Sequence, residues 1–258
     1  MKLLLQVRRF VLKTFVPEFI WPKHIDVDGV SIRIRGEPYS FGVKRVLLRG
    51  DYELTERQLI ARFVEPGMKV IEMGGSIGIV AAVLAHRIGP TGKLISVEAS
   101  DTLAAYSATW LEKDPQTKVV AGFGFPVWKV RPTLSVLGFE ESNGSLGGQV
   151  SVADADADAG DGSSGLGRSN IWDLSRICED HDIEPDVLVI DIEGSERIFF
   201  DHEPDWPDSV REVLIELHPQ QLDNGDADVR EICGKIEALG FVMREDLGNT
   251  FWFSRHAA

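Results

Sequence analysis

The feature that most constrains the fold of this chain is a glycine-rich turn between a buried strand and a helix. The turn lies in residues 70–81, VIEMGGSIGIVA, where an apolar run ends in Glu72 and Gly74, Gly75 and Gly78 follow. Glycine lets the backbone approach a ligand closely, and the first N–H groups of a helix are free to bind an anion. The turn therefore predicts an α/β fold that binds a ligand at this point.

The surrounding sequence alternates between strand and helix patterns from residue 67 onward. Short apolar runs such as MKVIEM, KLISVEA and TKVVAG indicate buried strands, and they are separated by segments with helical spacing of apolar residues. Continuous apolar strands are typical of parallel sheets that are covered on both faces. We therefore expect an α/β fold with a mostly parallel sheet and helices on both faces.

The first 49 residues form an N-terminal extension to the main domain, which we place at residues 50–258. The extension contains a helical pattern that begins at the N-terminus and then a hairpin with an Asp28-Gly29 turn. Arg8, Arg9 and Lys13 interrupt the apolar residues of the helix, so it is too polar to span a membrane. Either it packs on the domain or on a second subunit, or its basic face makes weak contact with a membrane surface.

Charge and composition exclude several classes of function. The net charge of −14 should repel phosphate backbones, so we expect no nucleic-acid partner. Two isolated cysteines predict neither a disulfide scaffold nor a zinc site. Residues 153–169 are rich in aspartate and poor in large apolar side chains, which predicts a flexible loop. This loop loosely resembles the start of a calcium-binding loop, but the closing glutamate is missing.

Two acids near the glycine turn indicate the kind of ligand. Ser76 breaks the dinucleotide-binding GxGxxG pattern, and Glu72 would repel a pyrophosphate, so a nicotinamide-dependent oxidoreductase is a weak alternative. Glu72 would instead attract the ammonium or sulfonium of S-adenosyl-L-methionine. Glu98 ends the next strand, where an acid can accept hydrogen bonds from both ribose hydroxyls. The spacing therefore predicts one crevice that binds a nucleoside.

Further acids and a histidine end two later strands. Asp191, Glu193 and Glu196 follow the run VLVI, and Glu216 and His218 lie in IELHP. Crowded acids have raised pKa values and can supply a general base, and a histidine at a strand end can do the same near neutral pH. The acids could also coordinate a divalent metal, but we assign no metal ligand from the sequence.

Together these motifs make the chain similar to the FkbM-like family of class I S-adenosylmethionine-dependent methyltransferases. The similar segments, in order, are GDYELTERQLIARFVEPGMKVIEMGGSIG, LISVEAS, VLVIDIEGSE and IELHP. The resemblance implies a Rossmann-like, seven-stranded, mostly parallel sheet whose last strand is antiparallel. It also implies methyl transfer to hydroxyl groups. It also implies roles for the Tyr52-Glu53 step before the glycine turn. The family usually has a lysine where this chain has Val189.

We therefore predict a cytoplasmic O-methyltransferase that uses S-adenosyl-L-methionine and acts on a small-molecule or glycan acceptor. The predicted cofactor-binding residues are Glu53, Glu72, Gly74, Gly75, Ser76, Gly78, Glu98 and Ala99, and the predicted catalytic residues are Asp191, Glu193 and His218. Asp191 and His218 are the candidates for the base. The alternative is a subunit or sensor that binds the cofactor without catalysis. The sequence does not indicate an oligomeric state.

Overall fold

The computed structural model describes residues 18–130, 134–141, 148–154, 171–193, 195–200 and 205–255. The N-terminal helix predicted for the first residues lies almost wholly outside them, and so does most of the acidic loop at 153–169. The expectations of membrane contact and of a calcium-like loop therefore fall on residues that are not described. Among the described residues, no helix is long and apolar enough to cross a membrane.

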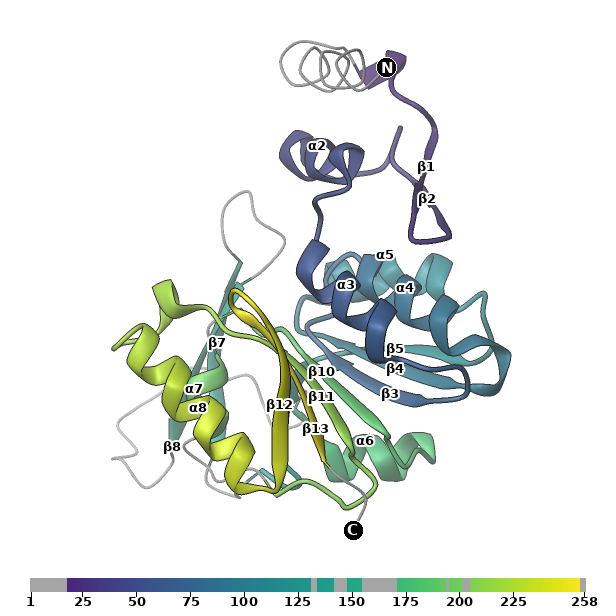
Figure 1. The fold of residues 1–258 in the computed structure, drawn as a ribbon. Helices are drawn as coiled ribbons and strands as arrows, with labels where there is room; N and C mark the ends of the chain where they lie inside the picture. The colour runs from purple at the N-terminus through teal and green to yellow at the C-terminus, as the bar shows by residue number, and fades with distance from the viewer. Residues whose placement is uncertain are drawn as a thin grey trace.

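The centre of the molecule is a seven-stranded sheet with the order β12-β13-β11-β10-β3-β4-β5 (Figure 1). Its strands are β3 (Lys69–Met73), β4 (Lys93–Glu98), β5 (Thr117–Ala121), β10 (Val187–Ile190), β11 (Glu212–Glu216), β12 (Phe241–Leu247) and β13 (Thr250–Arg255). Strand β13 runs antiparallel to both of its neighbours, β11 and β12, and all the other neighbouring pairs in this sheet are parallel. The predicted Rossmann-like, mostly parallel sheet is confirmed, including the reversed last strand.

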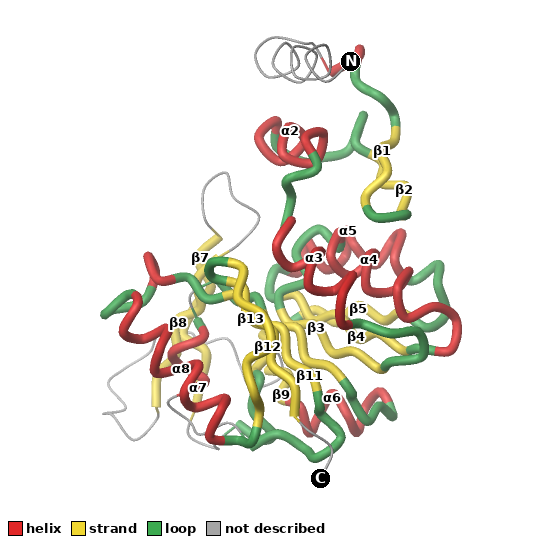
Figure 2. The backbone as a smooth tube through the Cα atoms, viewed as in Figure 1, coloured by secondary structure: helices red, strands yellow, loops and turns green. Residues whose placement is uncertain are grey.

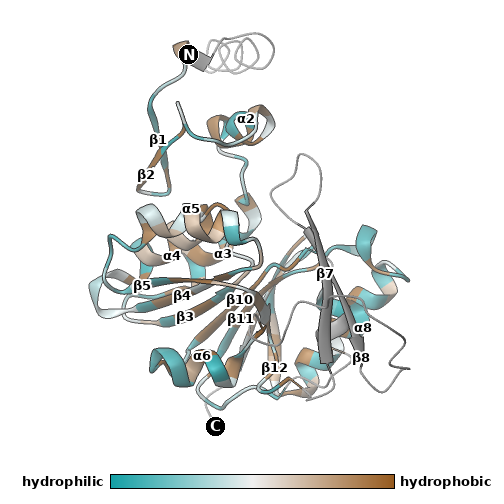
Figure 3. Cartoon of the chain, turned by 180° about the vertical axis from the view of Figure 1, so that it is seen from behind, coloured by the Kyte–Doolittle hydropathy of each residue, from teal (hydrophilic) through white to brown (hydrophobic). Residues whose placement is uncertain are grey.

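Helices cover both faces of this sheet (Figures 1 and 2). The helices of one face are α3 (Leu54–Phe63), α4 (Ile79–Ile88) and α5 (Asp101–Leu111), and those of the other are α6 (Leu174–His181), α7 (Glu196–Phe200) and α8 (Asp226–Ala238). Successive strand residues point to opposite faces, so Val70 belongs to the first core and Ile71 to the second. The strands are accordingly apolar along much of their length (Figure 3).

The N-terminal extension packs on the helical layer made by α3, α4 and α5. Its described part begins with the short 3-10 helix η1 (Glu18–Ile20), and strands β1 (His24–Val27) and β2 (Val30–Arg33) then form the predicted antiparallel hairpin. Helix α2 (Phe41–Arg49), which the sequence patterns did not reveal, follows with Ser40 as its N-cap. Ile34 and Leu47 are buried in the same core as α3 and α4. The domain division at residue 50 stays a prediction.

Smaller elements complete the described chain. Strand β6 (Phe123–Phe125) pairs in parallel with β9 (Ile171–Asp173), although the surrounding sequence, NIWDLSRICEDH, is typical of a helix. Strands β7 (Leu134–Glu141) and β8 (Gly148–Asp154) form an antiparallel pair. Helix α3 begins at Leu54, and the Thr250 hydroxyl hydrogen-bonds with the Thr55 hydroxyl. Two 3-10 turns, η2 (Gly89–Thr91) and η4 (Pro219–Gln221), follow α4 and β11.

Candidate active site

The predicted site residues converge at the point where the strand order of the sheet reverses. From β3 the chain continues to β4 and β5 on one side, and it later returns to β10 and β11 on the other. The carboxyl ends of the parallel strands therefore bring together the glycine turn, Glu98, Asp191 and His218. Ligands of open α/β sheets bind in the crevice at such a reversal.

The glycine turn fits closely against the ends of the neighbouring strands. The backbone N–H groups of Gly74 and Gly75 both donate to the carbonyl of Val97, over 2.9 and 3.1 Å. A Cβ atom on Gly74 would lie 1.6 Å from the carbonyl oxygen of Asp191, and one on Gly75 would lie 2.2 Å from the Ser96 hydroxyl. The glycines thus serve the packing of the turn on β4 and β10, in addition to any approach of a ligand.

Gly78 plays a similar part at the start of the following helix. It is the N-cap of α4 with a φ of +86°, and a Cβ there would lie 2.8 Å from the Leu111 side chain in α5. Glycine tolerates both this left-handed conformation and the close contact. The helix N-terminus is thereby held near the sheet, where its first N–H groups lie beside the crevice.

Glu98 lies at the end of β4, and its carboxylate joins the glycine turn to the segment that follows β4. One of its carboxylate oxygens accepts from the N–H of Ser76 and the other from the N–H of Ser100, each over 2.7 Å. Each oxygen of a carboxylate can accept more than one hydrogen bond, and these two amides fix the orientation of the group. Ala99, the next residue, is half-buried and packs against the small core around Phe123.

Glu72 lies beneath the glycine turn, where its side chain is almost wholly buried. It accepts a hydrogen bond from the Ser96 hydroxyl, and a Cβ on Gly75 would be 3.3 Å from one of its oxygens. Burial and the charge of Glu98 raise the pKa of Glu72, and the hydrogen bond from Ser96 opposes them, with a result of about 7. The carboxyl group would therefore ionise readily beside a bound cation.

The Tyr52-Glu53 step leads into α3 and is fixed by Arg57. The guanidinium of Arg57 donates to the carbonyls of Tyr52 and Gly50, each over 2.7 Å, and it pairs with Asp28 of the hairpin. The Tyr52 hydroxyl hydrogen-bonds with Ser76 of the glycine turn. Glu53 is thereby placed beside the ends of β10 and β11, where one of its oxygens lies within 4.8 Å of oxygens of Asp191 and Glu216.

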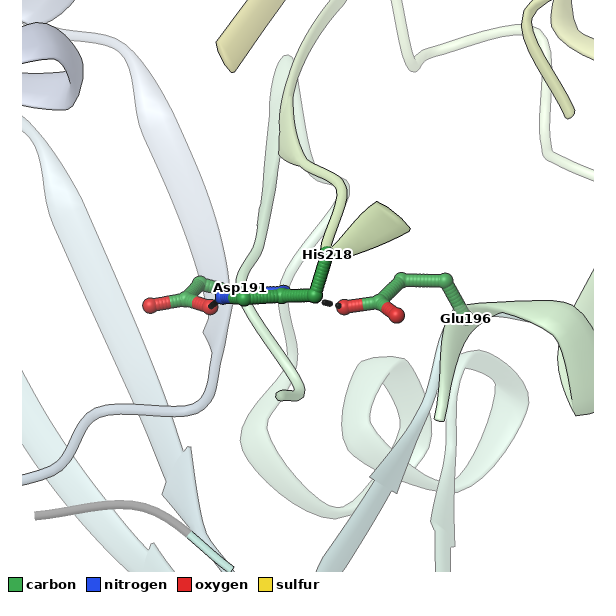
Figure 4. Close-up of side chains that lie close together, drawn as sticks. All are labelled: Asp191, Glu196 and His218. Carbon is green, nitrogen blue, oxygen red and sulfur yellow. Dashed lines mark hydrogen bonds and ion pairs between the residues drawn. The ribbon is translucent and has the colours of Figure 1, made fainter. Parts of the chain in front are cut away.

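His218 is the centre of an acid–histidine–acid arrangement (Figure 4). Its Nδ1 lies 3.2 Å from Glu196 Oε1, and its Nε2 lies 3.7 Å from Asp191 Oδ1. The Glu193 carboxylate is also 3.7 Å from Nε2. Burial alone lowers the pKa of His218, but the hydrogen bond with Glu196 and the charges of these acids outweigh it and raise the pKa to about 9.

A second group of acids shares Asp191 with this arrangement. Oxygens of Glu53, Glu56, Asp191 and Glu216 all lie within 4.8 Å of one another. Burial is the largest cause of the raised pKa of each of the four, and the charges of neighbouring acids add to it. For Glu53 the pKa reaches about 7. Such repulsion is costly unless protons or a cation neutralise the group.

Glu56 is the member of this group that the sequence interpretation missed. It lies on α3 only three and four positions before Leu59 and Ile60, which are fully buried, so it shares their face of the helix. A carboxylate on the apolar face of an amphipathic helix is the signal that could have identified it.

Left-handed backbone conformations are concentrated at this site. Five residues other than glycine have a positive φ in the described chain, and three of them are Glu53, Ser76 and Glu193, with φ between 42° and 51°. Such conformations cost free energy and persist where the surrounding structure enforces them. The strain supports the interpretation of this crevice as a functional site.

Comparison with known proteins agrees with the methyltransferase class expected from the sequence. Residues 54–128 match the model of the protein-L-isoaspartate (D-aspartate) O-methyltransferase family. The matched segment contains the glycine turn and Glu98, which are the residues predicted to bind S-adenosylmethionine. No curated protein sequence matches the chain.

Solved structures with a similar arrangement include several methyltransferases. Fibrillarin from Aeropyrum pernix, with bound S-adenosyl-L-methionine, is 12% identical over 78% of this chain and 74% of its own, with a TM-score of 0.44. An S-adenosylmethionine-dependent O-methyltransferase from Thermotoga maritima is 14% identical over 79% and 66%, with a TM-score of 0.41. The fibrillarin pre-rRNA processing protein of Methanococcus jannaschii is 12% identical over 74% and 67%, with a TM-score of 0.40. Because these similarities are low, the fold assignment rests on the strand order of the chain itself.

Proposed function

We propose that this chain is an S-adenosylmethionine-dependent O-methyltransferase that acts on a hydroxyl group of a small molecule or glycan. The observation that carries the proposal is the position of Glu98. Its carboxylate is fixed by the amides of Ser76 and Ser100 at the tip of β4, beside the glycine turn. This is the place where an α/β fold binds a ribose next to a helix N-terminus.

The residues present fit the cofactor. Glu98 would accept from the ribose hydroxyls, and the turn from Gly74 to Gly78 would hold the methionine end. The Glu72 carboxyl, with its pKa near 7, would ionise beside a cationic ligand. When bound, S-adenosylmethionine supplies an electrophilic methyl group. The work left to the protein is to align the acceptor and to take its proton.

The acceptor would approach from the ends of β10 and β11, where Asp191, Glu193 and His218 lie. The net charge of −14 supports a neutral or cationic acceptor and not a nucleic acid. Similarity to the FkbM-like family supports a hydroxyl as the accepting group. We further propose that the chain acts in the cytoplasm and that its basic N-terminal segment makes, at most, weak contact with a membrane surface.

Binding of the cofactor is the first test. Calorimetric titration of the purified chain should give micromolar dissociation constants for S-adenosylmethionine and S-adenosylhomocysteine, and no binding of NAD. Glu98→Ala should weaken the binding of the first two at least tenfold, because it removes the ribose acceptor. Glu65→Ala is the matched control, since Glu65 is exposed and distant from the crevice. Binding of NAD alone would contradict the proposal.

Proton removal from the acceptor is the second test. Asp191→Asn and His218→Ala should each lower turnover by about 10²–10⁴-fold while the cofactor still binds. The measurement is transfer of labelled methyl groups to a panel of hydroxyl-bearing acceptors. Full turnover in both variants would remove these residues from the mechanism. Binding of the cofactor without transfer to any acceptor would favour the alternative, a non-catalytic subunit or sensor.

A further inference from the structure

The four acids Glu53, Glu56, Asp191 and Glu216 gather at one place from three parts of the chain. Glu53 and Glu56 belong to the start of α3, Asp191 follows β10 and Glu216 ends β11. Each offers one oxygen, and these four oxygens lie within 4.8 Å of one another. Oxygen ligands of one Mg²⁺ or Ca²⁺ lie about 2.0–2.6 Å from the ion, so opposite ligands are about 4–5 Å apart. The group therefore has the size of a first coordination sphere.

Hydrogen bonding does not account for these carboxylates. Within the described part of the chain, Oε2 of Glu56 has no hydrogen-bond partner, and the whole residue is only 1% exposed. The described residues likewise offer no hydrogen bond to the buried Oδ1 of Asp191, although His218 Nε2 lies 3.7 Å away. A buried polar atom without a partner costs free energy, and a buried carboxylate costs more. These oxygens need a ligand or a proton.

Among the described residues, the acids of this group outnumber the cations that act on them. The largest charges that act on Glu56 come from Asp191, Glu53, Glu216 and Glu72, and all four are acids. On the cationic side, His218 and Arg57 act on Glu53. Arg57 is already bound to two carbonyls and to Asp28.

We propose that Glu53, Glu56, Asp191 and Glu216 bind one divalent cation. The donors are all carboxylate oxygens, which suit a hard ion such as Mg²⁺ or Mn²⁺ better than a soft one. The neighbouring group of Asp191, Glu196 and His218 also has the size of a metal site. Its imidazole, however, already hydrogen-bonds with Glu196 through Nδ1, so two of its three members are bound to each other.

If the methyl transfer proposed above holds, the cation site also indicates which oxygen groups the acceptor would carry. Mg²⁺ takes about six oxygen ligands, so four single carboxylate oxygens leave positions for water or for acceptor oxygens. The site lies at the ends of β10 and β11, on the side from which the acceptor would approach. An acceptor with two neighbouring oxygens, such as a vicinal diol, would suit it. Asp191 would then be a ligand of the cation.

Manganese binding tests the site without any need for cofactor or turnover. The full chain, freed of metal with a chelator and then exchanged into buffer at neutral pH, is titrated with Mn²⁺, and free Mn²⁺ is followed by its electron paramagnetic resonance signal. One ion per chain should bind with a micromolar dissociation constant. Glu56→Gln and Glu216→Gln should each weaken binding at least tenfold, whereas Glu65→Gln should leave it unchanged. Glu216 is only half-buried, so its variant guards against a loss of folding in Glu56→Gln.

The aspartate-rich segment that contains Asp156, Asp158 and Asp161 is the competing place for a cation. A triple asparagine variant at these positions should keep the tight Mn²⁺ site. Loss of tight binding in that variant, its survival in both glutamine variants, or the absence of tight binding in the unmodified chain would each overturn the proposal. Calorimetry with S-adenosylmethionine on the same samples separates this result from the methyltransferase proposal, since either can fail while the other holds.

Discussion

At the scale of single residues, the glycines of the turn show how one position can serve packing and binding together. Gly74 has a φ of +97°, and its α-carbon faces the Asp191 carbonyl so closely that no side chain fits. The sequence predicted a turn that lets a ligand approach. The structure adds that the turn also packs closely against the end of β10, because the crevice forms where the ends of β3 and β10 meet.

Substitution of Gly74 tests this requirement. Gly74→Ala should lower the free energy of unfolding by about 3 kcal/mol or more, since strain at a positive φ adds to a clash with backbone that cannot move aside. Gly248→Ala is the matched control, because Gly248 has a φ of +80° and nothing within 4 Å of the added Cβ. It should cost only about 1 kcal/mol. Equal losses in urea denaturation would show that the close contact is unimportant.

Residues that carry charge are harder to interpret from sequence than glycines are. Glu98 and Asp191 could be located because each ends an apolar strand. Glu56 could not be assigned to the site in this way, since its neighbours in the chain form a helix and its partners come from β10 and β11. The pattern of a helix shows which face is buried, but not which residues of distant strands lie opposite that face.

At the scale of elements, the segment between α2 and α3 depends on one buried arginine. Arg57 is 4% exposed and joins the segment to the β1–β2 hairpin through Asp28. It thereby fixes the Tyr52-Glu53 step against the glycine turn. An arginine suits this place because its planar guanidinium can donate to several acceptors at once.

Removal of this arginine should therefore lower the free energy of unfolding much more than removal of a surface arginine. Arg57→Ala should lower the free energy of unfolding by about 3 kcal/mol, because it leaves buried carbonyls without donors. Arg57→Lys should recover little of this loss. Arg62 makes an exposed ion pair with Glu245, and Arg62→Ala should cost under about 1 kcal/mol. Urea denaturation compares the three variants, and similar losses for Arg57→Ala and Arg62→Ala would refute the assignment.

At the scale of the whole molecule, two cores lie on opposite faces of one sheet. The first contains the inner faces of α3, α4 and α5 together with the N-terminal extension, and the second contains those of α6 and α8. The site lies between these layers at the carboxyl ends of the central strands, where the strand order reverses. Its acids are thus held by rigid elements on both sides, which suits a site that must keep carboxylates close together.

Features that depend on neighbours along the chain could be predicted from the sequence alone. The alternation of buried strands and helices, the glycine turn, the Asp28-Gly29 hairpin and the place of Glu98 all follow from short-range sterics and from the periodicity of burial. For this reason the parallel sheet with helices on both faces was predicted correctly, whereas the reversed last strand was implied by the resemblance to a known family. Helix α2 and strand β9 were missed, since each is short and β9 is defined by pairing with the distant β6.

The grouping of the acids, in contrast, is visible only in the tertiary structure. It placed Glu56 beside Asp191 and Glu216, set His218 between Asp191 and Glu196, and buried Glu72 beneath the turn. These groupings arise because the sheet order brings together strand ends that are far apart in sequence. Burial there removes the water that would otherwise screen the acids from one another, so their repulsion and their need for a cation or a proton exist only in the folded chain.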